Sequence, residues 1–362
     1  MGLQVLHHLP EGLLHTPATG LFRRLGGPTW IELEGRREPP LFISVLQHGN
    51  ETTGWDALRN VLLRHGPGSL PRRVHILLGN LRAAAVGLRK LDDQPDFNRC
   101  WPGGTLAPEW QDHPFTHITR QVMDRVTQCP PFASIDLHNN TGLNPHYGAL
   151  NRLDCRALHL ATLFSRTVVY FETPKGVQSM AMAEYCPALT LECGQVGERA
   201  ALDHAERFIE ACLRMDHLPD RPVPPHDIDL FHTLAVIRVP EQLDFSFDGS
   251  PARIRFVRQL DHLNFRELPA GTLLAEYQSD LPRPLQATDE HGRDISEAVF
   301  HFHNGEIRLK RAFMPAMLTL DHRIVRQDCL CYFMERMPPA ALPDGSIGHC
   351  LPAQGIQPDT MG

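Results

Sequence analysis

Hydrophobic positions in the first half of the chain form short, nearly continuous apolar runs, separated by stretches in which apolar residues recur at helical period. Such runs are typical of strands that are buried on both faces of a sheet, and the stretches between them predict amphipathic helices. We therefore expect an α/β fold in which helices flank a mixed central sheet. The predicted strands are Thr29 to Leu33, Leu41 to Leu46, Arg73 to Leu78, Phe132 to His138, Val168 to Phe171 and Ala188 to Glu192, and the predicted helices follow Thr53 and span His117 to Cys129 and Arg199 to Met215.

The pattern changes at Leu218 to Asp227, where four prolines fall within ten residues. A segment this rich in proline predicts a semi-rigid linker. Beyond it, short alternating segments divided by glycine and proline predict a smaller β-rich domain. We therefore expect an α/β domain of residues 1–222, a β-rich domain of residues 223–336 that covers the site of the first domain, and a Pro- and Gly-rich tail of residues 337–362.

Polar side chains occur where three of the predicted strands end. His48 and Glu51 follow the second strand, with Gly49 between them to ease the bend of the backbone, and His138 and Glu192 end two later strands. Ligands in open α/β sheets bind at the carboxyl ends of the strands. Imidazole nitrogens and a carboxylate oxygen are suitable zinc ligands, so His48, Glu51 and His138 predict a metal site. A structural role remains open for each, because the chain has 21 histidines and His138 can simply cap a strand.

Residues near these strand ends supply further candidate chemistry. Strand alternation places Asp136 on the same side as His138, where its carboxylate can orient a metal-bound imidazole. The carboxylate of Glu192 ends an apolar strand, where burial is unfavourable unless the group is paired or functional. The polar loop of residues 80–104 carries arginines such as Arg89 and Arg99, whose guanidinium groups can bind both oxygens of a carboxylate. Each arginine alone is equally compatible with a solvated loop charge.

Composition restricts the partners and the compartment. The 362 residues carry a formal net charge of −7, which provides no positive surface for nucleic acid or an anionic membrane. No apolar run approaches the roughly 20 residues of a membrane-spanning helix, and the start of the chain lacks the pattern of a secretory signal. The nine cysteines are odd in number and scattered, which favours reduced thiols, and we interpret Cys329 and Cys331 as structural. We expect a cytoplasmic protein with no nucleic-acid or membrane partner.

Four motifs follow one another along the chain. They are HGNE at residues 48–51, NRCWPG at 98–103, DLHNNTG at 136–142 and LTLECG at 189–194. Together they resemble the aspartoacylase and succinylglutamate desuccinylase family of the zinc carboxypeptidase clan, and the linker followed by a β-rich domain is similar to the two-domain plan of that family. The resemblance implies a zinc carboxypeptidase-like fold with one catalytic zinc ion per chain. The implied site residues are His48, Glu51 and His138 as metal ligands, Glu192 as general base and later general acid, Arg89 as the group that polarises the scissile carbonyl, and Asn98 and Arg99 as the pair that binds a substrate carboxylate.

Two departures from aspartoacylase affect the expected substrate. Aspartoacylase has an arginine about ten residues before the catalytic glutamate, which holds the second carboxylate of the substrate, and here Met180 to Met182 occupy that neighbourhood. Aspartoacylase also presents a tyrosine from the second domain, whereas the run from His303 to Phe313 contains none and has Glu306 at about that place. These differences disfavour N-acetylaspartate, and the segment Ala188 to Gly194 is closer to the desuccinylases. We expect second-domain residues to set specificity, with Glu306, Arg308 and Lys310 as candidates.

The predicted function is that of a zinc-dependent amidohydrolase, which uses metal-activated water to remove a small acyl group, such as succinyl or acetyl, from an N-acyl amino acid. A carboxypeptidase-type metallopeptidase is the first alternative, because Asn98 and Arg99 would equally bind the C-terminal carboxylate of a short peptide. The second alternative is a non-catalytic metal-binding protein on the same scaffold. Glu192 and Arg89 argue against it, since metal binding needs neither. The acyl group, the amino acid and the oligomeric state, a homo-oligomer included, stay open.

Overall fold

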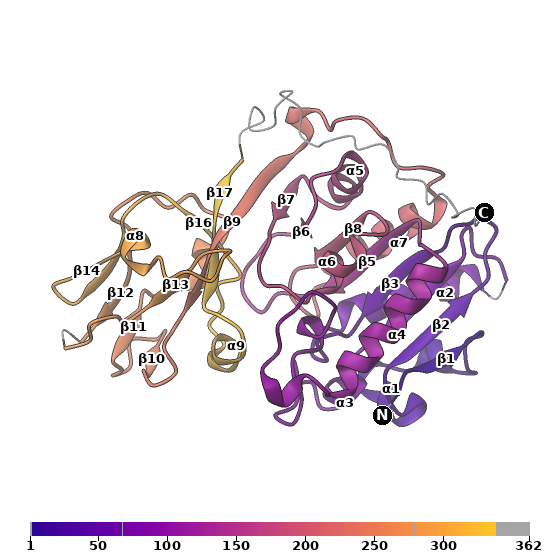
Figure 1. Ribbon diagram of the computed structural model, residues 1–362, viewed down its shortest axis with the longest axis horizontal. Helices are drawn as coiled ribbons and strands as arrows, with labels where there is room; N and C mark the ends of the chain where they lie inside the picture. Colours follow the sequence, from indigo (N-terminus) through magenta and orange to yellow (C-terminus); the bar gives the residue numbers. More distant parts are fainter. Residues whose placement is uncertain (1, 67, 279, 338–362) are drawn as a thin grey trace, which may run out of the picture.

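The computed structural model describes residues 2–66, 68–278 and 280–337. These residues form a twelve-stranded mixed sheet in the order β1-β2-β4-β3-β5-β8-β6-β7-β9-β17-β16, with β13 paired to β9, and a separate five-stranded sheet in the order β10-β11-β12-β15-β14. Figure 1 shows helices on both sides of the large sheet in one lobe and the five-stranded sheet in another. We call the described residues up to 228 the first lobe and those from 229 the second lobe. The predicted fold class, a helix-flanked mixed sheet with a β-rich C-terminal part, is confirmed.

The helices and strands have the following bounds. The strands of the large sheet are β1 (Gln4–Leu6), β2 (Thr29–Leu33), β3 (Leu41–Val45), β4 (Val74–Leu78), β5 (Ala133–His138), β6 (Tyr147–Leu150), β7 (Thr167–Tyr170), β8 (Ala188–Glu192), β9 (Asp229–Arg238), β13 (Gln286–Thr288), β16 (Met314–Ala316) and β17 (Cys331–Arg336). The smaller sheet contains β10 (Phe245–Ser246), β11 (Ile254–Phe256), β12 (Leu273–Tyr277), β14 (Phe300–His303) and β15 (Glu306–Leu309). The α-helices are α1 (Ala18–Leu25), α2 (Thr53–His65), α3 (Leu81–Ala84), α4 (Pro114–Gln128), α5 (Cys155–Phe164), α6 (Gln178–Met182), α7 (Arg199–Arg214), α8 (Ser296–Val299) and α9 (His322–Gln327).

Strands β3, β4, β5 and β8 form the parallel centre of the large sheet. Every residue of these four strands is buried, which explains why each appears in the sequence as a nearly continuous apolar run. On one face, Ile43 of β3 belongs to the same apolar cluster as Trp55 of α2 and Phe208 of α7. On the other face, Phe42 belongs to a cluster with Val122 of α4. Helices therefore cover both faces and leave the carboxyl ends of the strands for the site.

The second lobe continues the large sheet instead of beginning after a break. Strand β9 pairs in parallel with β7 of the first lobe and antiparallel with β17. The buried residues of the first large apolar cluster extend to Leu230, and those of the second begin at Ala235. The change of cluster thus lies a few residues after the proposed linker. The boundary at residue 222 stays a prediction, and the predicted tail lies outside the described residues except for Met337.

Two expectations from composition concern the rest of the described chain. Within the residues that the structure describes, no helix combines the length and the apolar character needed to cross a bilayer. Among the cysteines of residues 2–337, seven are free thiols, Cys329 and Cys331 included. Cys331 packs within the apolar cluster of the second lobe, and Cys329 packs against Val236 and Tyr332. These contacts support a structural role for the pair.

Candidate functional site

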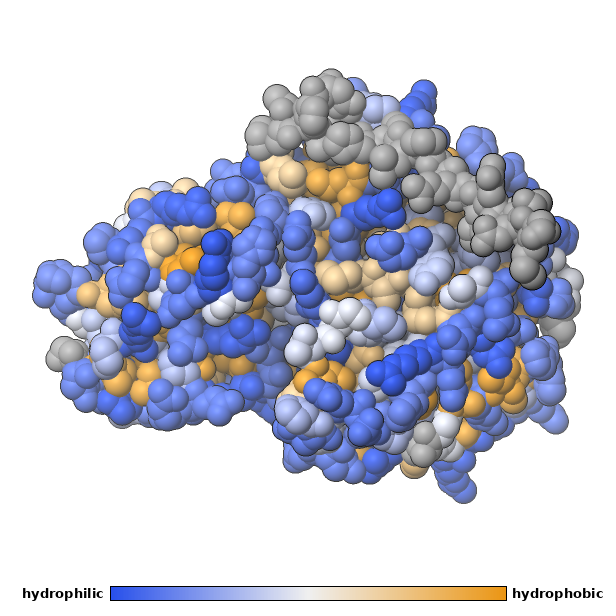
Figure 2. Space-filling view, viewed as in Figure 1, coloured by the Kyte–Doolittle hydropathy of each residue, from blue (hydrophilic) through white to orange (hydrophobic). Residues whose placement is uncertain are grey.

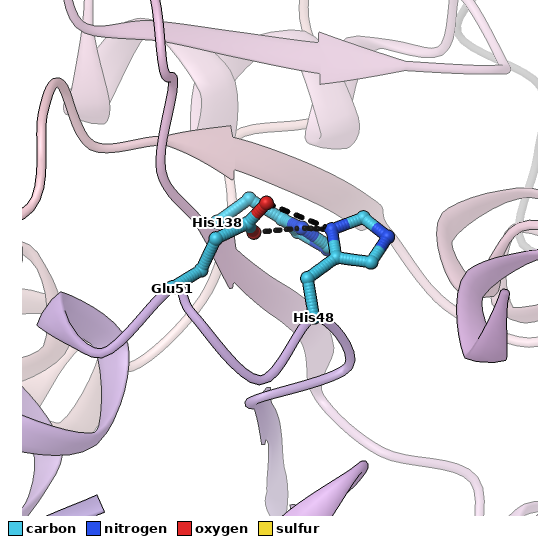
Figure 3. Close-up of side chains that lie close together, drawn as sticks. All are labelled: His48, Glu51 and His138. Carbon is cyan, nitrogen blue, oxygen red and sulfur yellow. Dashed lines mark hydrogen bonds and ion pairs between the residues drawn. The ribbon is translucent and has the colours of Figure 1, made fainter. Parts of the chain in front are cut away.

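Three predicted metal ligands converge at the carboxyl ends of two neighbouring strands (Figure 3). His48 and Glu51 lie in the turn between β3 and α2, and His138 ends β5, which pairs in parallel with β3. Oε1 of Glu51 lies 2.9 Å from Nδ1 of His48, and Oε2 lies 2.7 Å from Nδ1 of His138. All three side chains are buried, and their candidate ligand atoms lie within 4.8 Å of one another. This arrangement can hold a metal ion.

The groups around these ligands also fit a metal. Nε2 of His138 lies 2.7 Å from Oδ2 of Asp136, as strand alternation predicted, and Nε2 of His48 lies 3.0 Å from Oδ1 of Asp96. Metal-binding imidazoles ordinarily have such a carboxylate on the ring nitrogen that faces away from the ion, because it orients the ring and makes it a better donor. Both Nδ1 atoms are thus directed towards Glu51. Two histidines and one carboxylate are the protein ligands of many catalytic zinc sites, which keep a position for water.

The charges of the three ligands depend on one another. Burial by itself lowers the pKa of His138, but the carboxylates of Asp136 and Glu51 outweigh burial and hold the pKa well above its usual value. Burial favours a higher pKa for Glu51, yet His48 and His138 hold it far below its usual value. The histidines must lose protons before they can bind a metal, so metal binding releases protons and weakens as the pH falls.

Gly49 is required for a different reason from the one that the sequence suggested. Its φ angle is not in the left-handed region, but a Cβ at this position would lie 2.2 Å from the backbone nitrogen of Ala84 in α3. The turn that carries His48 and Glu51 therefore packs directly against the backbone of α3. Close packing, rather than the bend of the turn, excludes a larger residue here.

Replacing Gly49 with alanine tests this contact. We expect Gly49→Ala to lower the free energy of unfolding by about 1–3 kcal/mol, as overpacking typically does, and to weaken metal binding, because the ligand turn must move. Denaturant unfolding and a zinc titration measure the two effects. Gly2→Ala is the control, because a Cβ at Gly2 meets no atom within 4 Å. Unchanged stability and zinc affinity would show that the turn can shift freely.

Glu192 is next to the metal ligands on the adjacent strand. It ends β8 at the position paired with His138 of β5. Its carboxyl group is buried, and its Oε2 has no hydrogen-bond partner within the described part of the chain. Burial raises the pKa of Glu192 to about 7. A carboxyl group with such a pKa can both accept and donate a proton near neutral pH.

Arg89 and Arg99 face the same region from the loop after α3. Nη2 of Arg89 donates to Oδ2 of Asp96 at 2.9 Å and to Oδ2 of Asp328 at 3.1 Å. Nη1 of Arg89 lies 3.7 Å from Oε1 of Glu51, on the side of the metal ligands. Nη2 of Arg99 donates to Oδ1 of Asp328 at 3.2 Å. Asp328 belongs to the second lobe, and the sequence did not suggest a role for it.

Asn98 lies deeper than the two arginines. Its Nδ2 is 3.3 Å from Nε2 of His138, and its Oδ1 accepts a hydrogen bond from the backbone nitrogen of Gln178 at 2.9 Å. Asn98 therefore helps to position the His138 ring as well as lining the cavity. Its role in binding a substrate carboxylate stays a prediction.

The predicted metal ligands and the residues predicted for catalysis and carboxylate binding line one cavity between the lobes, whose empty volume is about 690 Å³ with open solvent included. They are His48, Glu51, His138, Glu192, Arg89, Asn98 and Arg99. Glu306, Arg308 and Lys310 do not line it, so this part of the sequence interpretation is wrong. Glu306 and Arg308 instead form an ion pair on the five-stranded sheet, with 41% of each side chain exposed. The second lobe lines the cavity with Thr233, Ala316, Met317, Asp328, Tyr332 and Met334.

Sequence reasoning missed three residues of the site. Asp96 contacts both His48 and Arg89, Asp328 contacts both arginines, and Tyr332 of β17 brings a tyrosine to the cavity from the second lobe. The run from His303 to Phe313, where the resemblance places such a tyrosine, contributes no residue to the cavity. The sequence around Asp328 gives a weak indication of a role, because an acidic residue directly before the apolar run from Cys329 to Met334 is unusual in a buried segment.

The fold and the site together define a class of protein. Three side chains that can hold a metal ion, beside a carboxyl group that can accept a proton, are typical of metal-dependent hydrolases. Residues 38–217 match the family model described as the succinylglutamate desuccinylase/aspartoacylase catalytic domain. The chain belongs to this family, whose members are amide hydrolases that remove acyl groups. A comparison with curated protein sequences finds no match.

Several solved structures are similar to this chain over most of its length. Succinylglutamate desuccinylase from Vibrio parahaemolyticus has a TM-score of 0.56 at 16% identity, over 84% of this chain and 85% of that one. A succinylglutamate desuccinylase/aspartoacylase from Rhodobacter sphaeroides has a TM-score of 0.55 at 16% identity, with coverages of 84% and 88%. Murine aminoacylase 3 has a TM-score of 0.52 at 17% identity, with coverages of 83% and 97%. At these identities the likeness shows a shared fold.

Proposed function

We propose that this protein is a zinc-dependent amidohydrolase that removes a small acyl group, such as acetyl or succinyl, from an N-acyl amino acid. The observation that carries the proposal is the position of Glu192, a buried carboxyl group with a pKa of about 7, in the same cavity as His48, Glu51 and His138. Metal binding alone needs no such group. Membership of a family of deacylases supports the same reaction type.

His48, Glu51 and His138 would hold one zinc ion per chain. Zinc, when bound in such a site, lowers the pKa of water to about 7 and polarises a carbonyl group. The two carboxylates behind the histidines, those of Asp96 and Asp136, keep the Nδ1 atoms directed at the ion position.

Glu192 moves the proton in the proposed reaction. Its Oε2, which meets no hydrogen-bond partner in the part of the chain that the structure describes, accepts a proton from the attacking water as the new bond from oxygen to the carbonyl carbon forms. Glu192 then gives this proton to the nitrogen of the leaving amine as the C–N bond breaks. Each substrate thus consumes one water and yields a carboxylic acid and a free amine, and Glu192 ends the cycle in its starting state.

Arg89 stabilises the negative charge that develops on the carbonyl oxygen. Asp96 and Asp328 hold one edge of its guanidinium group, and Nη1 remains on the side of the metal ligands. A donor that is already in place stabilises the developing charge more than a flexible donor does, because it does not have to reorganise during the reaction. Arg99 and Asn98 line the same cavity, where we assign them to the carboxylate of the amino acid.

Removing the guanidinium group tests the role of Arg89. We expect Arg89→Ala to lower kcat by about 10²- to 10³-fold, the usual loss for one such donor, with one zinc ion still bound per chain. Steady-state kinetics and metal analysis of the same preparation measure both quantities. Arg82→Ala is the control, because Arg82 lies in the neighbouring helix α3 and pairs with Asp93 outside the cavity. Near-normal turnover by Arg89→Ala would contradict the assignment.

A substrate panel tests the proposed function itself. Zinc-loaded protein is given succinyl, acetyl and formyl derivatives of acidic, basic and neutral amino acids, together with short peptides, and release of the free amine is measured. Hydrolysis of the N-acyl amino acids is the expected result. Hydrolysis of the peptides alone would indicate a metallopeptidase. Stoichiometric zinc without hydrolysis of any compound would indicate a metal-binding protein.

A further inference from the structure

Asp328 is an acidic residue of the second lobe that reaches the active-site cavity of the first. It follows α9 directly, and its side chain is only 15% exposed. Its two carboxylate oxygens accept hydrogen bonds from Nη2 of Arg89 and Nη2 of Arg99, at 3.1 and 3.2 Å. Burial favours a higher pKa for Asp328, but Arg99 and Arg89 outweigh burial and keep the pKa low. The two arginines thus hold an ionised carboxylate that belongs to the protein.

The charges around this cavity balance before any substrate binds. Among the described residues that line it, Arg89 and Arg99 are the only lysines or arginines. Their charges are matched by Asp328 and by Asp96, which contacts Arg89. A divalent ion at the metal site would likewise be matched by Glu51 and by Glu192 in its ionised form. Every further carboxylate in the cavity would therefore add uncompensated negative charge.

The rest of the cavity wall is largely apolar. The first lobe contributes Ala149 and Val169 from β6 and β7, and the second lobe contributes Ala316, Met317 and Met334. In the space-filling view, tan and orange residues gather near the middle of the face that is shown, between the two lobes (Figure 2). Burying an unpaired carboxylate against such a wall is strongly unfavourable, whereas burying an aliphatic group is favourable.

We propose that Asp328 determines substrate specificity by competing with substrate carboxylates for Arg89 and Arg99, so that the site selects N-acyl amino acids whose side chain and acyl group are uncharged and apolar. This inference rests on the proposed function and narrows its substrate class. One carboxylate, that of the amino acid, can still share Arg99, because a guanidinium group has five N–H donors. A second carboxylate, on the side chain or on the acyl group, finds no free cation.

A pair of isosteric ligands and an isosteric variant test the charge directly. N-acetylaspartate and N-acetylasparagine have nearly the same shape and differ by one charge, as do Asp328 and its replacement in Asp328→Asn. We expect the unchanged protein to prefer N-acetylasparagine at least about tenfold, both in kcat/KM and in Kd from calorimetry, and Asp328→Asn to reduce this preference about tenfold or more. The change is expected in KM and Kd more than in kcat. N-acetylleucine is expected to bind more tightly than N-acetylasparagine.

The control is Asp280→Asn, which removes one charge from an exposed ion pair with Arg253 in the second lobe, outside the cavity. It should keep the unchanged preference. A preference of the unchanged protein for N-acetylaspartate would overturn the inference, and this test needs no variant. The inference is also overturned if Asp328→Asn keeps the original ratio of Kd values, or if N-acetylleucine binds more weakly than N-acetylasparagine. Absence of hydrolysis with every ligand would contradict the proposed function, and the Kd ratios would still decide the inference.

Discussion

Glu192→Gln is expected to lower kcat by about 10²- to 10⁴-fold, with zinc content and KM nearly unchanged. Glutamine keeps the shape of the side chain but cannot accept the proton of water. The buried carboxyl group of Glu192, whose Oε2 has no hydrogen-bond partner in the described residues, lies at the pairing position opposite His138. Its position and its raised pKa therefore support the proposal that it is the proton acceptor.

The same residue predicts the pH dependence. Burial raises the pKa of Glu192 to about 7 in the metal-free protein, and the positive charge of a bound ion lowers it. A base must be deprotonated to act, so kcat should be maximal above this pKa and fall as the pH drops through it, at or below pH 7. Glu192→Gln should lose this acidic limb.

Kinetics across a pH series measure both effects of Glu192→Gln. The control is Glu184→Gln, because Glu184 is exposed at the surface outside the cavity. Turnover within a few-fold of the unchanged protein, or an acidic limb that persists in Glu192→Gln, would assign the proton transfer to another group.

Glu51→Gln is expected to weaken zinc binding by at least about 100-fold, since loss of a group that merely supports a ligand already costs 10- to 100-fold. Glu51 contacts both histidines, at 2.9 and 2.7 Å, so it is the shared centre of the ligand set. An amide has nearly the same shape but lacks the negative charge that a divalent cation requires. Activity should fall with the zinc content.

Thermal unfolding with and without zinc measures this effect without using catalysis. Zinc at 100 times its Kd should stabilise the unchanged protein by about 2.7 kcal/mol, and Glu51→Gln should show little or no shift at the same zinc concentration. His226→Ala is the control, because His226 is 82% exposed and lies outside the site. If Glu51→Gln kept the full shift, the ion would bind elsewhere.

Much of the fold could be predicted because the central strands are buried on both faces. The predicted strand from Ala188 to Glu192 coincides with β8, and the strand from Leu41 to Leu46 ends one residue beyond β3. Some short elements could not be predicted. Strand β6 (Tyr147–Leu150) is one example. Its four residues have only a weak apolar pattern, and they form a strand because they pair with β7 and β8.

The chain's own sequence determined the first-lobe half of the candidate site, because His48, Glu51, His138 and Glu192 stand at or just after the ends of parallel strands. The sheet brings such ends to one edge. Only the tertiary structure decided what the second lobe adds. Asp328 meets Arg89 across 239 positions of the chain and Arg99 across 229, and no local pattern encodes such contacts. The same docking of β9 and β17 onto the first sheet brings Tyr332 to the cavity and leaves Glu306 outside it.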